Sequence, residues 1–439
     1  MNRLTRRELL VLGRNMGAGL AAGALLPLAG CHHREAQPSS RVLAPGASPL
    51  GEGSLKAHAL NANILSGCAV DVHALRMDTR YRGLVAEQCS IVVAENAMKW
   101  EALRPAPGVF EFADADYLVE FAEKNDIKLR GHNLLWHRAL PKWFNDSVFK
   151  GNAKQVLTEH IATVAGRYAG RMHSWDVVNE AIDPNDQRLD GLRKTVWLEL
   201  IGEDYIEIAF RAARQADPSA LLTYNEYGIE ADNYASDQKR AQVLLLLRRL
   251  KARNVPLDAV GIQSHLPAEA LNSSAQYTGV AHFIAQVRAM GLQVFITEMD
   301  VSDSAIQGDQ RERNRAVAAT YSDYLHVVLA DTAVKAVLTW GISGRHTWLS
   351  SEQPRADHGA LQPLPFDAEY RTLPAFFAMR GAYDARLESL KNPAASAVNP
   401  WTPFTPRAKA AAADKVPAVP QPATAPAGTL PSMPAPKKN

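Results

Sequence analysis

Short apolar runs alternate with longer amphipathic segments through the middle of this chain. Apolar runs rich in β-branched residues and bounded by polar residues predict buried strands, whereas apolar residues recurring every three or four positions predict helices. Helices of this kind are expected over residues 204–215 and 236–253, each followed by a proline-containing stop. Strands are expected over residues 65–70, 91–95, 128–132, 174–179, 221–225, 259–264, 294–298 and 336–340.

This alternation predicts the fold class. Eight strands separated by helices over about 330 residues are what an α/β fold of the (β/α)8 type, a TIM barrel, requires. We therefore expect a single catalytic domain over residues 56–391. Polar and aromatic residues collect at the C-terminal end of nearly every expected strand, the end at which such barrels carry their active sites.

The N-terminal segment predicts export. A twin arginine, Arg6-Arg7, precedes an apolar stretch rich in Ala and Gly, which ends in Leu28-Ala29-Gly30-Cys31. A charged start, an apolar middle and small residues at the end form an export signal over residues 1–31, and the arginine pair indicates the twin-arginine (Tat) route. The last four residues resemble a lipobox, in which Cys31 is lipidated. We expect the exported protein to be a membrane-tethered lipoprotein in the periplasm or cell envelope. The alternative is an incidental Cys31 and a soluble product.

Two further segments flank the expected barrel. Residues 32–55 are rich in Pro, Ser, Gly and Ala and are expected to form a flexible tether. Residues 392–439 hold 11 of the 26 prolines of the chain. Because this composition cannot bury enough apolar surface to offset the entropy of ordering, a disordered tail is expected there.

Charge and cysteines limit the partners of the chain. The total net charge is +2, but residues 1–41 carry +4 and residues 391–439 carry +5, which leaves −7 on the body between them. An acidic body disfavours nucleic acid as a partner. Cys68 and Cys89 could form a disulfide in an oxidising compartment or remain buried thiols, and no metal site is expected from them.

Two glutamates are the candidate catalytic residues. Glu180 follows an apolar run that begins at Trp175, and Glu298 ends the run 294–298. Cleavage of a glycosidic bond requires a proton for the leaving oxygen and a group that meets the oxocarbenium-like centre, and two carboxylates in different environments supply both. The spacing along the chain leaves retention and inversion of configuration both open.

Other polar and aromatic side chains follow the remaining strands. Sugar hydroxyls need several hydrogen-bond donors and acceptors, and sugar faces need flat apolar surfaces. For any single Trp or His, packing at the barrel rim is an equally good interpretation. His132 and His265 lack the i, i+4 spacing on a helix that is typical of one kind of zinc site, so no metal is expected. No organic cofactor is expected either. The expected substrate-binding residues are Glu95, Asn96, Lys99, His132, Trp136, Asn179, Gln263, His265, Trp340 and Trp348.

An ordered set of motifs resembles one enzyme family. These motifs are Asn96-Ala97-Met98-Lys99-Trp100, Gly131-His132-Asn133-Leu134-Leu135-Trp136-His137, the segment from Trp175 to Glu180, Gln263-Ser264-His265-Leu266 and Thr297-Glu298-Met299-Asp300. In this order they resemble glycoside hydrolase family 10, the endo-β-1,4-xylanase family, over nearly all of residues 60–386.

The resemblance implies roles for these residues in a retaining double displacement. Glu298 would be the nucleophile and Glu180 the acid/base. Asn179 would hold the 2-hydroxyl of the sugar under attack. His265, with Gln263 and Asp300, would orient Glu298. The glycone side would be lined by Glu95, Asn96, Lys99, His132 and Trp340, with Trp136 and Trp348 as walls.

Departures from the family pattern keep other activities open. Glu226 and Gly228 stand in Asn-Glu-Tyr-Gly where the family usually has Asn-Asp-Tyr-Asn, and Gly344 and His346 replace an Asp and an aromatic residue. An endo-β-1,4-xylanase acting as a monomer on xylan or xylo-oligosaccharides is the first hypothesis. The second is a related glycosidase for decorated xylo-oligosaccharides or mixed-linkage glucan. The third is a glycan-binding lipoprotein that does not cut its ligand.

Overall fold

The computed structural model describes residues 48–269 and 277–392. The predicted export signal with Cys31, the tether as far as residue 47 and the tail from residue 393 onward lie outside the described residues.

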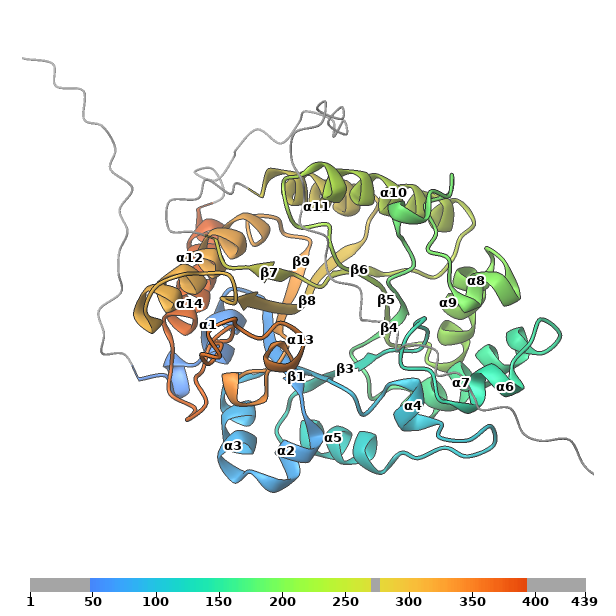
Figure 1. Ribbon diagram of the computed structural model, residues 1–439, viewed down its shortest axis with the longest axis horizontal. Helices are drawn as coiled ribbons and strands as arrows, with labels where there is room; N and C mark the ends of the chain where they lie inside the picture. The colour runs from blue at the N-terminus through green and yellow to red at the C-terminus, as the bar shows by residue number, and fades with distance from the viewer. Residues whose placement is uncertain (1–47, 270–276, 393–439) are drawn as a thin grey trace, which may run out of the picture. The chain divides into compact units, whose positions relative to one another are not determined.

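Eight parallel strands close into a barrel, as predicted (Figure 1). Each strand pairs in parallel with its neighbours, and the pairings of β6 with β8 and of β9 with β1 complete the circle. The fold is therefore a (β/α)8 barrel. Its strands are β1 (Leu65–Val70), β2 (Ile91–Ala94), β3 (Lys128–His132), β4 (Ser174–Asn179), β5 (Leu221–Glu226), β6 (Ala259–Ile262), β8 (Gln293–Ser302) and β9 (Val334–Thr339).

Five strands, β2, β5, β6, β8 and β9, differ from the sequence prediction at one or both ends, and two of these differences bear on the site. β8 runs four residues past the predicted end at Glu298, and β6 ends two residues before the predicted residue 264. The extra length of β8 pairs with a short additional strand, β7 (His265–Pro267), which the sequence did not predict. Its register places His265 opposite Asp300. The extended C-terminal half of β8 therefore gives His265 a fixed position at the mouth of the barrel.

Helices surround the barrel and connect its strands (Figure 1). The predicted helices over 204–215 and 236–253 correspond to α9 (Tyr205–Ala216) and α10 (Tyr234–Ala252). No described helix is both long and apolar enough to cross a membrane. The other helices are α1 (Leu55–Asn61), α2 (Val72–Met77), α3 (Thr79–Gln88), α4 (Trp100–Leu103), α5 (Ala113–Lys124), α6 (Trp143–Ser147), α7 (Ala153–Arg167), α8 (Val196–Ile201), α11 (Thr278–Ala289), α12 (Gln310–Val328), α13 (Leu349–Glu352) and α14 (Pro374–Lys391), with short 3-10 turns at Gly51–Gly53, Pro184–Asp186 and Gly344–His346.

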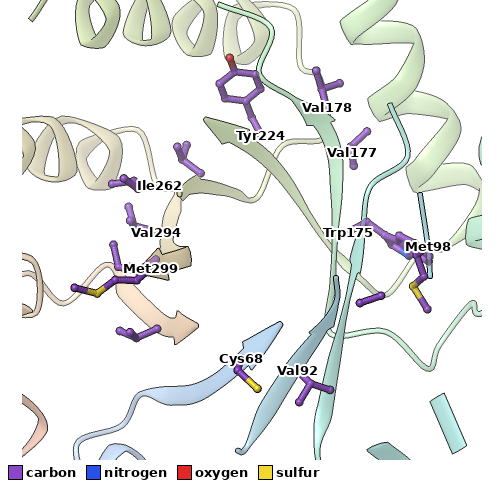
Figure 2. Close-up of a cluster of buried hydrophobic side chains, with 14 of the residues drawn as sticks. Cys68, Val92, Met98, Trp175, Val177, Val178, Tyr224, Ile262, Val294 and Met299 are labelled. Atoms are coloured by element: carbon purple, nitrogen blue, oxygen red, sulfur yellow. The ribbon is translucent and has the colours of Figure 1, made fainter. Parts of the chain in front are cut away.

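Strand side chains alternate between two apolar layers. On β2, Ile91 and Val93 belong to a small cluster with Phe295 and Leu338, whereas Val92 belongs to a much larger cluster. The small cluster fills the barrel interior. The large cluster, called the outer cluster below, packs the strands against the helices, and part of this outer cluster appears in Figure 2. This period of two is the geometry of a β-strand with one face toward the barrel axis.

The alternation breaks on β4. Val177 and Val178 are consecutive in sequence, yet both belong to the outer cluster (Figure 2). The register against β5 shifts between Asp176 and Val178, as expected of a β-bulge. The shift leaves Asn179 facing the side chains at the mouth of the barrel.

The same kind of break occurs on β8. Ile296 and Met299 both belong to the outer cluster, and the register against β9 shifts between them. As a result Thr297 and Glu298, although adjacent, both reach the same side chain at the end of β5. Bulges of this kind re-aim side chains next to active sites.

The two cysteines of the barrel are free thiols. Cys68 lies on β1 and Cys89 follows α3, and both are buried. Their sulfur atoms are 3.6 Å apart, the distance of a thiol–thiol contact. The hydrogen bond with Cys89 and burial raise the pKa of the Cys68 thiol, so it stays protonated.

Candidate active site

Glu180 directly follows β4, and Glu298 lies in the C-terminal half of β8, so both are at the C-terminal side of the barrel. Glu180 is the residue directly after β4, with φ of 59°, and its N–H donates to the carbonyl of Asn225 at 2.9 Å. Glu298 lies within β8 and is 5% exposed. Positive φ is uncommon for a residue with a side chain and marks backbone that its surroundings must hold in place.

Three side-chain amides join the two carboxylates in one hydrogen-bonded chain. Nε2 of Gln263 donates to Oε1 of Glu180 at 3.1 Å and to Oδ1 of Asn179 at 3.3 Å. The same Asn179 oxygen accepts from Nδ2 of Asn225 at 2.9 Å, and that nitrogen also donates to Oε1 of Glu298 at 2.7 Å. The positions of the two carboxylates are therefore coupled through neutral groups, which orient them without adding charge.

The central amide of this chain depends on a glycine in the next strand. A Cβ atom at Gly261 of β6 would overlap the side-chain oxygen of Asn225 and would lie 2.9 Å from the methyl group of Thr297. Oδ1 of Asn225 instead accepts a hydrogen bond from the Thr297 hydroxyl at 2.7 Å. Glycine at 261 thus leaves the space in which Asn225 can turn its NH2 group toward Glu298.

His265 connects the buried Glu298 to Asp300. Its Nε2 lies 3.3 Å from Oε2 of Glu298, and its Nδ1 lies 2.9 Å from Oδ1 of Asp300. Burial would lower the pKa of His265, but the two carboxylates outweigh it and raise that pKa well above the usual value. His265 is therefore a cation that donates to both carboxylates at neutral pH. The second oxygen of Asp300 accepts from Nε1 of Trp348 at 2.7 Å.

The environment of Glu298 favours its ionised form. Burial alone would raise the pKa of this carboxyl group, but the hydrogen bond from His265, the charges of His132 and His265 and the hydrogen bond from Asn225 lower it below the usual value. A buried carboxylate that is ionised and held by oriented donors has the properties of a nucleophile or of a group that stabilises positive charge.

Glu180 has a different set of partners. Nε1 of Trp136 donates to its Oε2 at 2.9 Å, and Nδ2 of Asn179 lies 3.3 Å from its Oε1. The backbone oxygen of Trp136 is held by Nε1 of Trp197 at 2.8 Å. Burial lowers the pKa of neighbouring His137 to about 4, against the opposing effect of the Glu180 charge, so this imidazole is neutral. The side chain of Glu180 is partly exposed. Among the described residues, only neutral groups donate hydrogen bonds to it, which suits a group that exchanges protons.

The predicted residues after β2 form a second part of the site. Nζ of Lys99 donates to Oδ1 of Asn96 at 2.7 Å and lies 5.6 Å and 6.0 Å from the ring centres of Trp136 and Trp340. Burial lowers the pKa of Lys99, although Glu298, Glu95 and Glu180 pull it in the other direction. Lys99 therefore lies in the electrostatic field of both candidate catalytic groups.

The carboxyl group of Glu95 has a strongly raised pKa. Burial and repulsion by Asp71 raise its pKa to about 7, with Lys99 acting in the opposite direction. A carboxyl group that is half protonated near neutral pH can both donate to and accept from a hydroxyl group.

His132 lies against the aromatic wall of the site. Its ring centre is 5.3 Å from that of Trp340, and its Nδ1 lies 3.0 Å from Oδ2 of Asp176. The other oxygen of Asp176 pairs with the buried guanidinium of Arg130. Within the described residues, no group of three or more His, Cys, Asp or Glu side chains could hold a metal ion.

The structure thus brings the predicted residues together at one end of the barrel. Most of them contact one another directly, and Glu95 interacts electrostatically with Lys99. Sequence reasoning counted Asn225 only as one of several polar residues at strand ends, and it gave no site role to Asp176 or Thr297. Asn225 had one usable signal, since it is a polar residue at the end of a predicted strand. The other two lie inside strands, where only the bulges and pairings of the folded barrel reveal their contacts.

A (β/α)8 barrel that carries one glutamate directly after β4 and another on β8, in different environments and with indoles around them, defines a glycoside hydrolase. The comparison with known families agrees: residues 54–382 match the model of glycosyl hydrolase family 10. The chain belongs to this family.

Named relatives and solved structures resemble the chain over most of its length. Endo-1,4-beta-xylanase B of Thermotoga neapolitana is 31% identical over 76% of this chain and 91% of its own. Endo-1,4-beta-xylanase 3 of Hypocrea jecorina is 34% identical over 72% of this chain and 81% of its own. The crystal structure of xylanase 10B from Thermotoga petrophila RKU-1 in complex with xylobiose is 32% identical, with a TM-score of 0.68, and covers 76% of this chain and 98% of that one.

Proposed function

We propose that this protein is a retaining endo-β-1,4-xylanase that cuts internal bonds of xylan, with Glu298 as the nucleophile and Glu180 as the acid/base. The family, the xylanase names of its relatives and the xylobiose bound to a similar barrel support the substrate class. The single observation that carries the residue assignment is the amide chain from Glu180 to Glu298, which holds two carboxylates of different character in one site.

The first half of the proposed reaction forms a glycosyl-enzyme. A carboxylate oxygen of Glu298 attacks the anomeric carbon, the bond from that carbon to the leaving oxygen breaks, and Glu180 transfers its proton to the leaving oxygen. His265 and Asn225 keep Glu298 ionised and oriented before the attack. Glu180 is left as a carboxylate, with Trp136 donating to it.

The second half returns both groups to their starting state. Glu180 takes a proton from water, the water oxygen attacks the anomeric carbon, and the ester bond to Glu298 breaks. The sugar leaves with a hydroxyl group in its original configuration, because two inversions have occurred. Glu298 is again a carboxylate and Glu180 is again protonated.

Residues around the pair are proposed to bind the sugar chain. The Asn179 oxygen is occupied by two amide donors, so its NH2 group, which faces Glu180, is available to the 2-hydroxyl of the sugar under attack. Indole faces provide flat apolar walls for sugar rings. On the glycone side we place Glu95, Asn96, Lys99, His132 and Trp340, and we place Trp136 and Trp348 as walls, with Gln263 and His265 beside the reacting carbon.

A second candidate is a related specificity, and one departure from the family pattern favours it. His346 packs edge-on against Tyr81, with ring centres 5.1 Å apart, and its Nε2 lies 3.3 Å from the Tyr370 hydroxyl. A polar ring therefore stands where the family usually has an aromatic side chain. His346 lies in the segment between Trp340 and Trp348, so this departure keeps decorated xylo-oligosaccharides and mixed-linkage glucan as alternative substrates.

A product profile separates these candidates. The purified protein is incubated with xylan, arabinoxylan, glucuronoxylan, mixed-linkage glucan and cellulose, and chain lengths of the products are measured. We expect internal cuts in xylan with an early fall in viscosity. Preferred cleavage of mixed-linkage glucan or of short decorated oligosaccharides would support the second candidate. Binding without cleavage of any polymer would instead support a non-hydrolytic glycan-binding protein.

We also propose the cellular setting that the N-terminal sequence predicts. Arg6-Arg7 would direct the folded chain to the Tat route, and Cys31 would be lipidated and hold the enzyme, as a monomer, at the cell envelope. The residues between Cys31 and the barrel would then act as the tether.

A further inference from the structure

The backbone at Glu180 is held in a conformation that side-chain-bearing residues seldom adopt. Its φ of 59° lies in the left-handed region. The preceding bulge on β4 and the hydrogen bond from its N–H to Asn225 fix one side of this residue. Its carbonyl group needs a partner on the other side, since such strain persists only where surrounding structure determines it.

That partner is Arg193, which lies between the 3-10 turn Pro184–Asp186 and helix α8. Nε of Arg193 donates to the carbonyl oxygen of Glu180 at 2.9 Å. Its two terminal nitrogens donate to Oδ2 of Asp183 at 2.8 Å and to the hydroxyl of Tyr227 at 2.9 Å. One side chain thus joins Glu180, the segment after it and the residue that follows β5.

The backbone of Arg193 is equally well anchored. Its N–H donates to the carbonyl of Ala181 at 2.7 Å, and the neighbouring residues Ile182 and Leu192 form an antiparallel bridge. The Arg193 side chain is 13% exposed. Because both the backbone and the side chain of Arg193 are fixed, its guanidinium group can hold the backbone of Glu180 in place.

A buried carboxylate completes the support. Oε2 of Glu226, at the end of β5, accepts from the N–H of Ile182 at 3.2 Å and from the Tyr224 hydroxyl, and its Oε1 pairs with Nζ of Lys239 at 2.8 Å. The ammonium group of Lys239 in turn lies 3.6 Å from the ring centre of Tyr227. The segment that carries Glu180 is therefore attached to the end of β5 through Asn225, through Glu226 and, by way of Arg193, through Tyr227.

We infer that Arg193 is a positioning residue for the acid/base Glu180, an inference that rests on the proposed function. The guanidinium contacts the main-chain oxygen of Glu180, so it acts by fixing where the carboxyl group can point. Proton transfer requires the acid within hydrogen-bond reach of the leaving oxygen, and a displacement of about 1 Å costs on the order of a hundredfold in rate. Attack by Glu298 on a substrate whose leaving group needs no proton does not depend on this position.

Leaving-group dependence tests the inference. Arg193→Gln and Arg193→Lys are compared with wild type on dinitrophenyl xylobioside, which leaves without a proton, and on phenyl xylobioside and xylan, which require one. For Arg193→Gln we expect kcat/KM on phenyl xylobioside and xylan to fall by about 10- to 100-fold and that on dinitrophenyl xylobioside by less than about threefold. Arg193→Lys should lose almost as much, because a single ammonium group cannot replace the fork.

Two further variants control the result. Arg188→Gln removes an arginine of the same loop that pairs with Asp190 and Glu203, so its kinetics should match wild type. Tyr227→Phe removes only one partner of Arg193, keeps the ring, and should show a smaller split of the same sign even if Arg193→Gln folds poorly.

The outcomes are distinct. Equal losses on both aryl xylobiosides in Arg193→Gln, or the absence of any split in Tyr227→Phe when Arg193→Gln does not fold, would overturn the positioning role. If wild type cleaves neither aryl xylobioside nor xylan, the proposed function itself is wrong.

Discussion

Nδ2 of Asn225 lies 2.7 Å from Oε1 of Glu298, and the amide oxygen of Asn225 is turned away from that carboxylate by the Thr297 hydroxyl. An amide can present either its oxygen or its nitrogen to a neighbour. Here Thr297 determines which one faces the proposed nucleophile, so the carboxylate meets a donor. The adjacent positions of Thr297 and Glu298 on a bulged strand make this arrangement possible.

Replacement of Glu298 by Ala should abolish hydrolysis. We expect kcat on xylan to fall by more than about a thousandfold, because a covalent catalyst loses orders of magnitude when its nucleophile is removed. A 2-deoxy-2-fluoro xylobioside should label wild type at Glu298, as measured by peptide mass spectrometry. A folded variant that keeps more than about a tenth of the wild-type rate, or a label on another residue, would disprove the assignment.

Replacement of Glu180 by Ala should affect substrates unequally. Dinitrophenyl xylobioside should give a burst of phenolate followed by slow turnover, since the covalent intermediate still forms but no base activates water. Azide should accelerate the slow phase by attacking the intermediate, and xylan should hardly be cut. Similar losses on both substrates, without a burst or an effect of azide, would contradict the acid/base role.

Replacement of His265 by Ala should change the pH dependence of the enzyme. The hydrogen bond from His265 and its charge lower the pKa of Glu298 against the effect of burial, so their loss should raise that pKa. Because Glu298 must be ionised to attack, the acid limb of the kcat/KM profile should move to higher pH. At the pH optimum kcat should fall by about 10- to 1000-fold while KM changes little. A raised KM with unchanged kcat and an unmoved acid limb would exclude this role.

Replacement of Gly261 by Ala should disturb catalysis from the neighbouring strand. The added methyl group would overlap the Asn225 amide and displace its hydrogen bond to Glu298. We expect kcat on xylan to fall by about 100-fold and the melting temperature to drop as the core is overpacked.

Gly166→Ala is the matched control for this variant. A Cβ at Gly166, in α7, would meet no atom within 4 Å apart from its chain neighbours and the backbone of its own helix, so activity should be unchanged and stability equal or slightly higher. Near-normal activity of Gly261→Ala would show that the amide chain is not required.

Replacement of Cys31 by Ala should release the enzyme from the membrane. Each buried CH₂ of an acyl chain contributes about 0.8 kcal/mol to anchoring, and two or more chains hold a protein durably. The twin arginine is upstream and unchanged, so export should continue. Cell fractionation should show xylanase activity moving from the membrane pellet to the soluble fraction. Wild-type activity that is already soluble would support ordinary signal cleavage.

The barrel could be predicted from the sequence because its strands are nearly continuous apolar runs separated by amphipathic helices. The structure confirms the fold class, and every predicted strand corresponds to an observed one with end shifts of up to four residues. β7 escaped prediction because a three-residue strand has no pattern of its own; it exists only through its pairing with β8.

The contacts of the site were harder to predict, because they depend on breaks in the strand period. A strict period of two places Glu298 and Thr297 on opposite faces of β8, whereas the bulge brings both to Asn225. Gly261 shows a second limit. A glycine in a strand can mark a bulge or a close approach, and only the position of the Asn225 amide identifies which of the two applies.

The register of β7 against β8 has a consequence for engineering this scaffold. His265 faces Asp300 through backbone pairing, so the imidazole is aimed by main-chain hydrogen bonds between segments far apart in the sequence. Residues 263–267 and 298–302 therefore form one transplantable unit. A chimera in which only one of these segments is exchanged would keep all motif residues but would place the imidazole incorrectly. Exchange of both segments together would preserve the pairing of His265 with Asp300.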